Sequence, residues 1–271
     1  MQGREDELLE ARILDAVQKC SRGNLAVIPF LDPRECKLAE RALRAAGAWE
    51  SAWLWGGHPD AERRVLFLLP DYLCACLSDQ PTRCQPEEVL GLLLEDAERA
   101  VCALGITGSG FRVLSHRDYL GSILALGVER GALGDIAVQN EREAVVFCSA
   151  TMSSFLRENL TRIASDAVKV RPYVLDSAFT DGKHYEPICD TVASERLDCV
   201  VAALCNLSRE AAQTLIRSDA VEVDFEPTSR VDLPLPSPST LSIRGYGRFV
   251  LRSYDGETRK GRLRLRADKL V

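Results

Sequence analysis

Apolar residues in the first eighty positions follow a helical spacing first and then gather in short runs. Leu9, Ile13 and Val17 recur at steps of four residues with charged residues between them, which predicts an amphipathic helix. Asp32-Pro33 follows a short apolar run and is typical of a helix start, where aspartate caps and proline occupies the first turn. The elements predicted for this part are a helix over 5–20, a strand over 25–32, a helix over 33–46 and strands within 48–57 and 62–73.

The next hundred residues alternate between strand and helix patterns. Residues 79–88 contain two prolines and no periodic apolar pattern, so they mark a boundary, and residues 87–103 have a helical pattern. Beyond them we predict strand, helix, strand, strand, helix and strand over 103–106, 116–126, 135–139, 144–148, 152–163 and 168–175. This order is the ferredoxin-like arrangement, in which two helices cover one face of four antiparallel strands. Residues 176–194 are polar, which predicts a connector.

The last part of the chain begins with two short helices and ends in strands. Apolar residues between 197 and 204 share one face of a helix that follows Ser194, and Leu207-Ser208 cap a second helix. Residues 239–271 alternate in period two around Asp255-Gly256, which predicts a β-hairpin with its turn there. We therefore predict an α+β fold with an N-terminal α/β domain over 1–82, a middle domain over 83–180 and a C-terminal domain over 181–271.

The composition is that of an average globular protein, but the charge is unevenly distributed. The chain has 271 residues, of which 46% are hydrophobic and 27% charged, and its net charge is −6. Residues 241–271 hold nine Lys or Arg against three Asp or Glu, so this segment carries +6 and the other 240 residues carry −12. A basic end on an acidic body is typical of a surface that faces a polyanion such as RNA.

The cysteines and the apolar runs bear on compartment and cofactors. Ten cysteines behind an N-terminal stretch that lacks an apolar signal region indicate a reducing compartment, so we expect a cytoplasmic protein with free thiols. A zinc site from Cys74, Cys76 and Cys84 with His58 is conceivable, but structural zinc prefers cysteines paired at short spacings. No heptad pattern and no apolar run of membrane-spanning length occurs. We expect a monomer without a metal, a cofactor or a membrane partner.

The two helices and the strand after residue 194 resemble the small RNA-binding fold named after ribosomal small-subunit protein S-four. The matching residues are Arg196-Leu197-Asp198, Leu207-Ser208-Arg209, Gln213, Leu215-Ile216, Val221-Glu222-Val223 and residues 243–249. The chain departs from the pattern at Ser218-Asp219-Ala220, where glycine usually precedes the first valine, and at Asp224, where asparagine is usual. The resemblance implies that the start of the second helix binds an RNA phosphate. The residues then expected to contact RNA are Arg196, Ser208, Arg209, Gln213, Arg217, Arg244, Arg248 and Arg252.

A wider set of motifs resembles the YlmH family of bacterial proteins along essentially the whole chain. The motifs are Gly56-Gly57, Glu62-Arg63, residues 116–121, residues 126–130, Gly134-Asp135-Ile136 and the S-four-type segment. The resemblance implies an N-terminal α/β domain, an RRM-like middle domain and a C-terminal S-four-type domain. It also implies binding of ribosomal RNA and tRNA on the large ribosomal subunit, in ribosome-associated quality control of retained peptidyl-tRNA. The family has an older genetic association with cell division.

Two classes of function remain open from the sequence. His116-Arg117-Asp118 has the order of a protein-kinase catalytic loop, but Ile123 stands where that loop needs asparagine, which excludes a kinase. Pseudouridine synthases also join an S-four-type domain to a catalytic domain, so an RNA-modifying enzyme is the alternative. No nucleotide-binding glycine loop, metal-ligand spacing or nucleophile–base motif is present, which favours a non-enzymatic RNA-binding protein.

The motif in the middle domain has two interpretations. His116, Arg117, Asp118 and Arg130 either form an internal network of ion pairs with Asp135 or make a second contact to RNA. RRM domains stack bases on aromatic residues of their central strands, and the candidate strands offer Phe147 alone. Stacking of single-stranded RNA on this sheet is therefore not expected.

Overall fold

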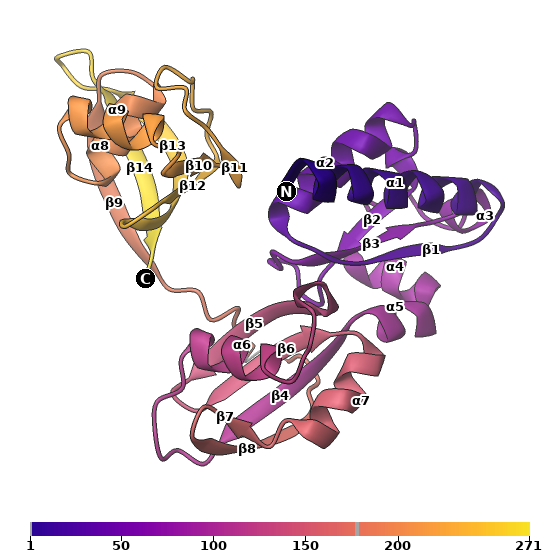
Figure 1. Cartoon of the computed structure of the whole chain (residues 1–271). Coiled ribbons are helices and arrows are strands. Elements are labelled where there is room, and N and C mark those ends of the chain that lie inside the picture. Colours follow the sequence, from indigo (N-terminus) through magenta and orange to yellow (C-terminus); the bar gives the residue numbers. More distant parts are fainter. Residues whose placement is uncertain (1, 177–178) are drawn as a thin grey trace. The chain divides into compact units, whose positions relative to one another are not determined.

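The computed structural model describes residues 2–176 and 179–271. The chain divides into two compact units, Met1–Gly182 and Lys183–Val271 (Figure 1). The first unit holds a three-stranded and a five-stranded sheet, and the second holds a six-stranded sheet. All strand pairs are antiparallel. The mixed content of helices and separate antiparallel sheets confirms an α+β protein.

The three-stranded sheet forms the N-terminal part of the first unit. Its strands β1 (Ala26–Leu31), β2 (Ala52–Trp55) and β3 (Arg64–Leu68) lie in the order β1-β3-β2. Helices α1 (Gln2–Ser21) and α2 (Pro33–Ala45) pack on one face of it, and a short 3-10 helix, η1 (Trp49–Ser51), precedes β2. Asp32 caps α2 as predicted, because its carboxylate accepts from the Glu35 backbone while the Glu35 carboxylate accepts from the Asp32 backbone.

A helical connector leads to the middle part. It consists of α3 (Asp71–Cys74), α4 (Pro86–Leu93) and α5 (Glu95–Ala100). The single helix predicted over 87–103 is wrong, because Leu94 adopts a positive φ of 40° and separates α4 from α5. Residues from Cys102 onward already belong to strand β4, whose alternation of buried and exposed residues continues past the predicted helix end.

The middle part alternates strands and helices in the predicted order. The elements are β4 (Cys102–Gly108), α6 (His116–Leu124), η2 (Arg130–Ala132), β5 (Leu133–Asn140), β6 (Glu143–Cys148), α7 (Ala150–Asn159), β7 (Arg162–Ile163) and β8 (Asp166–Pro172). The strand order is β5-β6-β4-β8-β7, with α6 and α7 on one face. Helix α7 ends at Asn159 and not at 163 as predicted, since Arg162–Ile163 pair with the start of β8.

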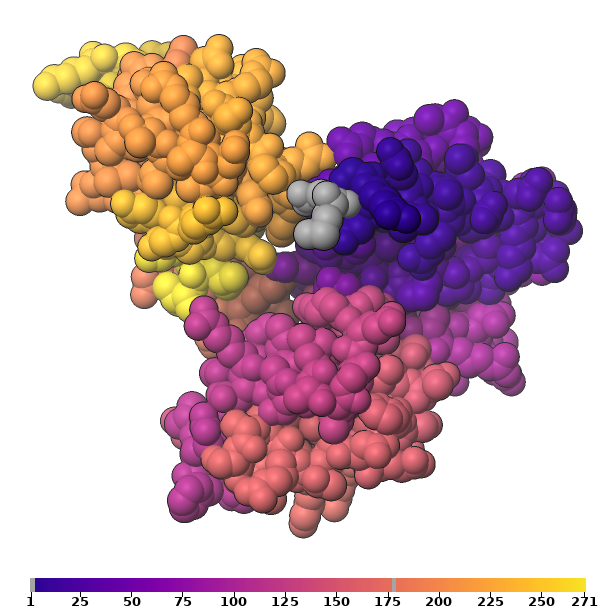
Figure 2. Space-filling view, viewed as in Figure 1, coloured from indigo at the N-terminus to yellow at the C-terminus, as the bar shows by residue number. Residues whose placement is uncertain are grey.

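The opposite face of this sheet is also covered where β5 and β6 lie. Ala137, Val145 and Phe147 are buried against α4, α5 and the three-stranded sheet. In the space-filling view the indigo and purple N-terminal part and the magenta and pink middle part adjoin (Figure 2). The five-stranded sheet is thus a central layer of the first unit, with apolar residues packed on both sides.

The second unit places two helices against one face of its sheet. The strands are β9 (Tyr185–Val192), β10 (Val221–Val223), β11 (Glu226–Pro227), β12 (Ser239–Ile243), β13 (Gly247–Glu257) and β14 (Leu263–Leu270), in the order β11-β10-β12-β13-β14-β9. Helices α8 (Leu197–Leu204) and α9 (Arg209–Arg217) share one apolar core with the inward residues of these strands. Ser208 caps α9 as predicted, accepting from the Ala211 backbone.

Two predictions for this unit are wrong. The polar segment predicted as a connector contains β9, which pairs with β14 along its whole length at the edge of the sheet. The predicted turn at Asp255-Gly256 lies inside β13, where the strand register shifts between Tyr254 and Glu257 and Gly256 has a φ of +71°. Such a glycine forms a bulge. The chain turns instead at residues 258–262, around Gly261.

Candidate nucleic-acid interface

A buried carboxylate organises the N-terminal ends of both helices in the second unit. Asp198 in the first turn of α8 has no exposed surface. Arg196 donates from Nε to Oδ1 at 3.1 Å and from Nη2 to Oδ2 at 3.2 Å, and Arg209 donates from Nε to Oδ2 at 2.9 Å. Gln213 donates to the same Oδ2 at 2.8 Å. The structure thus brings three of the predicted RNA-contacting side chains onto one acid, which belongs to the matching motif but not to the predicted RNA-contacting residues.

The charge of Asp198 is strongly stabilised by these donors. Burial alone raises the pKa of a carboxyl group, because it removes water from the charged form. The hydrogen bonds from Arg196, Arg209 and Gln213 outweigh that effect and hold the pKa of Asp198 well below its usual range. The carboxylate therefore stays ionised and fixes both guanidinium groups, whose side chains remain 40% and 54% exposed for Arg196 and Arg209.

Helix α9 extends this arrangement along its exposed face. Arg209, Gln213 and Arg217 are spaced four residues apart, so they lie in one stripe on the helix. Ser208 and Arg209 begin the helix, where backbone N–H groups and the helix dipole favour an anion. A pocket of about 300 Å³ adjoins this end, lined by Arg209, Arg262, Asn206, Leu207 and residues 190–193 among others. Arg262 was not among the predicted site residues. Its position in the basic segment 241–271 was the sequence signal that could have identified it.

The other three predicted arginines lie elsewhere in the second unit. Phe249 and Leu251 of β13 point into the core under the helices, so Arg248 and Arg252 lie on the opposite face of the sheet. Arg248 stands over the Phe225 ring at 5.3 Å, and Arg252 donates to Asp268 at 2.7 Å. Arg244 is exposed in the turn between β12 and β13. The predicted set is therefore divided between two faces of one sheet.

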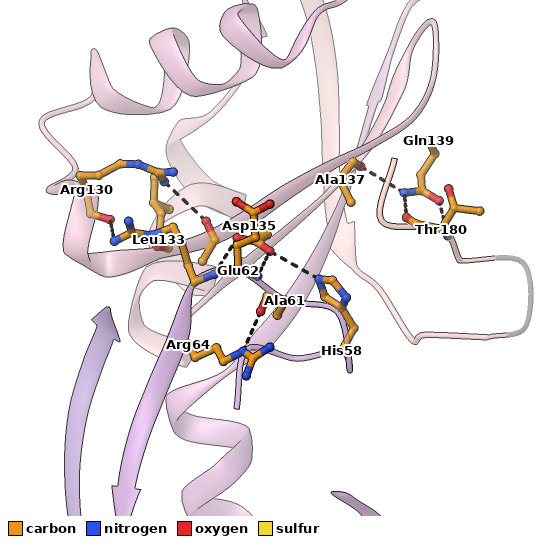
Figure 3. A network of polar contacts seen from close by, with 12 residues as sticks. His58, Ala61, Glu62, Arg64, Arg130, Leu133, Asp135, Ala137, Gln139 and Thr180 are labelled. Carbon is orange, nitrogen blue, oxygen red and sulfur yellow. Dashed lines mark hydrogen bonds and ion pairs between the residues drawn. The ribbon is translucent and has the colours of Figure 1, made fainter. Parts of the chain in front are cut away.

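Asp135 organises a second polar network, inside the first unit (Figure 3). Its carboxylate accepts from the backbone N–H groups of Glu62 at 2.7 Å and Arg63 at 3.0 Å, and His58 Nε2 lies 3.7 Å away. The buried Arg63 side chain in turn donates from Nε to the Leu133 carbonyl at 2.8 Å. These contacts bind the loop between β2 and β3 to the start of β5.

Glycines allow this loop and β5 to come close. A Cβ added at Gly57, whose φ is +102°, would stand 2.3 Å from the Phe147 ring. A Cβ added at Gly134 would stand 2.6 Å from the Phe30 ring. The motif residues Gly56-Gly57, Glu62-Arg63 and Gly134-Asp135 thus meet at the contact between the two sheets of the first unit.

The motif of the middle domain, for which the sequence left two interpretations open, does not form one network. Its four residues are His116, Arg117, Asp118 and Arg130. Asp118 belongs to the capping box of α6, where it accepts from Ser115, and it pairs with Arg112 at 3.2 Å. Arg130 contacts the other network through its carbonyl, which accepts from Arg63. His116 and Arg117 are exposed at the start of α6. The pKa of His116 is held below its usual value, first by loss of hydration and then by the charge of Arg130.

The described residues contain no cluster of three or more His, Cys, Asp or Glu that could hold a metal ion. The considered set of Cys74, Cys76, Cys84 and His58 is accordingly not assembled, and the thiols of Cys74 and Cys76 donate to the backbone carbonyls of Leu69 and Tyr72. Within residues 2–176 and 179–271, no helix is both long and apolar enough to cross a membrane.

Comparison with known proteins gives three similarities. Residues 100–177 match the family described as "Putative RNA-binding domain in YlmH". The chain is 29% identical over 236 residues to the ribosome-associated protein quality control protein P2 of Bacillus subtilis (strain 168), covering 87% of this chain and 84% of that protein. It is also similar to the solved structure of cell division protein ylmH from Streptococcus pneumoniae, with 21% identity, a TM-score of 0.48 and coverage of 63% of this chain and 92% of that one. The resemblance to the YlmH family is confirmed by the relative and by the match of residues 100–177 to the family model of the YlmH RNA-binding domain.

Proposed function

We propose that this chain is a non-enzymatic RNA-binding protein that acts on the large ribosomal subunit in quality control of stalled peptidyl-tRNA. The single observation that carries the proposal is the pair of arginines that buried Asp198 fixes, Arg196 at the start of α8 and Arg209 at the start of α9. The printed name of the Bacillus subtilis relative and the description of the matching family support it. Its partners would be ribosomal RNA and tRNA, and it would act as a monomer in the cytoplasm.

We further propose that the chain has three domains, over 1–82, 83–180 and 181–271. The strand order β5-β6-β4-β8, with α6 and α7 on one face, supports an RRM-like middle domain. The helix pair α8 and α9, followed by β10 and β12, supports an S-four-type C-terminal domain. The two compact units are compatible with these boundaries, because the first unit contains two sheets.

The proposed RNA contacts differ in their physical character. Arg196, Ser208, Arg209 and Gln213 form a preorganised site, since Asp198 orients three of the side chains before RNA binds. Arg217 continues this site along α9. Arg244, Arg248 and Arg252 lie away from the helices and would attract RNA mainly through charge. A phosphate at the start of α9 would accept hydrogen bonds from backbone N–H groups and from the Arg209 guanidinium.

The experiment compares Arg209→Ala with the matched control Arg44→Ala. Both arginines are ion-paired and about half exposed, Arg44 with Glu40 on α2 and Arg209 with Asp198. Binding of the full chain to purified large-subunit particles is measured across a salt series. We expect Arg209→Ala to lower the affinity about ten- to a hundred-fold and to reduce the logarithmic salt slope by somewhat less than one unit.

Arg44→Ala should leave both quantities nearly unchanged, because α2 belongs to the other unit and carries no proposed contact. Equal losses for the two variants would mean that diffuse charge, and not the α9 site, attracts the particle. Thermal unfolding of Arg209→Ala accompanies the measurement, so that affinity is compared on folded protein.

A further inference from the structure

The sheet of the middle part offers no exposed aromatic ring for base stacking among its buried strands β5 and β6. On one side the sheet packs against α6 and α7, and on the other Ala137, Val145 and Phe147 are buried, whereas Lys169 and Arg171 of β8 are exposed. Phe147, the aromatic residue that a base would need, is fully buried and contacts the His58 ring at a centroid distance of 5.0 Å. A base that stacks on an aromatic residue of this domain therefore needs a ring other than that of Phe147.

The loop between β4 and α6 carries the most exposed large apolar side chain among the described residues. Phe111 is 88% exposed, and Val113 beside it is 62% exposed. An exposed phenylalanine side chain contributes nothing to the stability of the fold, since burial of apolar area is what stabilises it. Its position at the tip of the loop, on a domain that buries the aromatic residues Tyr119 and Phe147, points to a role in contact with another molecule.

This loop is held firmly at both ends. Ser109 donates from its backbone to Asp166 Oδ2 at 3.1 Å, and its hydroxyl donates to Asp166 Oδ1. The backbone of Phe111 donates to the same hydroxyl at 3.2 Å. At the other end Leu114 is buried and donates to the Glu141 carbonyl at 2.8 Å. Because Asp166 is itself buried, Phe111 is presented on a preorganised loop, and binding through it costs little ordering entropy.

One cation stands beside the loop tip. The exposed Arg142 side chain lies against Gly110, where an added Cβ would be 3.2 Å from Nη1. Arg112 is paired with Asp118, and Glu141 and Glu143 flank Arg142, so the region has no large excess of positive charge. An exposed aromatic ring next to the Arg142 guanidinium fits an unpaired nucleobase and its phosphate, whereas a duplex backbone would need a wider basic surface.

We propose that the loop Ser109–Val113 is a binding site for an unpaired RNA base, which stacks on Phe111 while Arg142 contacts the adjacent phosphate. The proposal rests on the RNA-binding function proposed above and adds a second site in the first unit. It differs physically from the α9 site, because stacking contributes most of the affinity and few counterions are released. Single-stranded RNA is therefore its ligand class.

The test uses the full chain and two labelled probes, a twelve-nucleotide oligouridine and a twelve-base-pair RNA duplex. Phe111→Ala should weaken binding of the single strand roughly 5- to 150-fold, the effect of losing one stacked base. Its affinity for the duplex and its salt slope should stay unchanged. Phe111→Trp should bind the single strand as well as the wild type, and its additional emission should be quenched by the oligouridine.

Tyr72→Ala is the matched control, since Tyr72 is an aromatic residue on α3 with 61% exposure. It should bind both probes normally. Unchanged single-strand affinity in Phe111→Ala together with unquenched Phe111→Trp emission overturns the proposal and leaves the α9 site intact. If the wild type binds neither probe nor large-subunit particles, the proposed function itself fails. Loss of particle binding in Phe111→Ala with both probes bound normally would assign the loop to a protein contact and reject stacking.

Discussion

Asp135 in the first unit and Asp198 in the second both belong to sequence motifs, yet they bind different partners. Asp135 accepts from two backbone N–H groups of a loop more than seventy residues away in the chain. Asp198 accepts from three side chains, two of which remain about half exposed. The first acid joins two parts of the fold, whereas the second fixes groups that a ligand can reach.

The difference shows why a motif of charged residues does not by itself indicate a binding site. A carboxylate that satisfies backbone donors stabilises the chain, and its loss leaves those donors unpaired. A carboxylate that orients exposed arginines arranges positive charge for an anion, at the expense of their own solvation. Variants at the two acids and at the residues around them should therefore separate stability from RNA affinity.

The largest effect is expected for Gly57→Ala at the contact near Asp135. The new methyl group would overlap the buried Phe147 ring, and φ of +102° is unfavourable for alanine. We expect unfolding free energy to fall by about 3–5 kcal/mol in thermal or urea unfolding. Gly91→Ala in α4 is the control, because a Cβ there meets nothing within 4 Å and alanine favours a helix. A normal melting temperature for Gly57→Ala would mean that the sheets do not pack as described.

Asp135→Ala should destabilise the fold somewhat less, and should not change RNA affinity on the folded fraction. The Glu62 and Arg63 backbone donors lose their acceptor, which corresponds to about 2–4 kcal/mol for two such hydrogen bonds. Unfolding monitored by tryptophan fluorescence measures the loss, and the salt series with large-subunit particles measures affinity. If the Asp135→Ala protein were stable but no longer bound the particles, Asp135 would serve RNA binding as Asp198 does, and the contrast between the two acids would be wrong.

Local signals in the sequence predicted many of the elements but few of their long-range contacts. Asp32-Pro33 and Ser208 mark helix starts because a capping side chain acts within three residues. Strand β9 was missed because it is an edge strand whose exposed side is polar, so its alternation is weak. The pattern predicts a turn at Gly256 because a bulge and a turn both use glycine at positive φ.

The sequence predicted the basic and amide residues of the candidate site, but it did not predict that a buried carboxylate, Asp198, would bind them together. The S-four-type resemblance led to Arg196, Arg209 and Gln213, whose common partner Asp198 lies within the same motif. Nothing in the spacing shows that this acid is fully buried, since burial depends on packing against distant strands. For the same reason Arg248 and Arg252 were grouped with α9, although strand alternation places them on the other face.

Asp198→Asn should produce a smaller loss of stability that depends on pH. The folded pKa of Asp198 is depressed, so its contribution is present above the unfolded value near 4 and disappears as pH falls through the folded value. We expect about 1–3 kcal/mol lost at pH 7 and a shallower decline in acid than in the wild type. Urea unfolding between pH 2 and pH 7 measures it, with Asp96→Asn, an exposed acid on α5, as control. Parallel pH curves for wild type and Asp198→Asn would contradict the depressed pKa.

The smallest effect is expected for Arg117→Ala, which tests the idea that the middle motif is one internal network. Arg117 is exposed in the first turn of α6, and no hydrogen bond or ion pair of its side chain is found in the part of the chain that the structure describes. A positive charge there is opposed by the helix dipole, so its removal should change the unfolding free energy by no more than about 0.5 kcal/mol.

If the melting temperature of Arg117→Ala were several degrees lower than that of the wild type, Arg117 would belong to a stabilising network like that of Asp135. If the stability is unchanged, Arg117 is available to bind an external anion, because its side chain then stabilises nothing at the N-terminus of α6. Binding of Arg117→Ala to large-subunit particles then decides whether the start of α6 adds a phosphate contact beside Phe111. A salt slope reduced by somewhat less than one unit would show that contact, and an unchanged slope would leave the α9 arginines as the main electrostatic site.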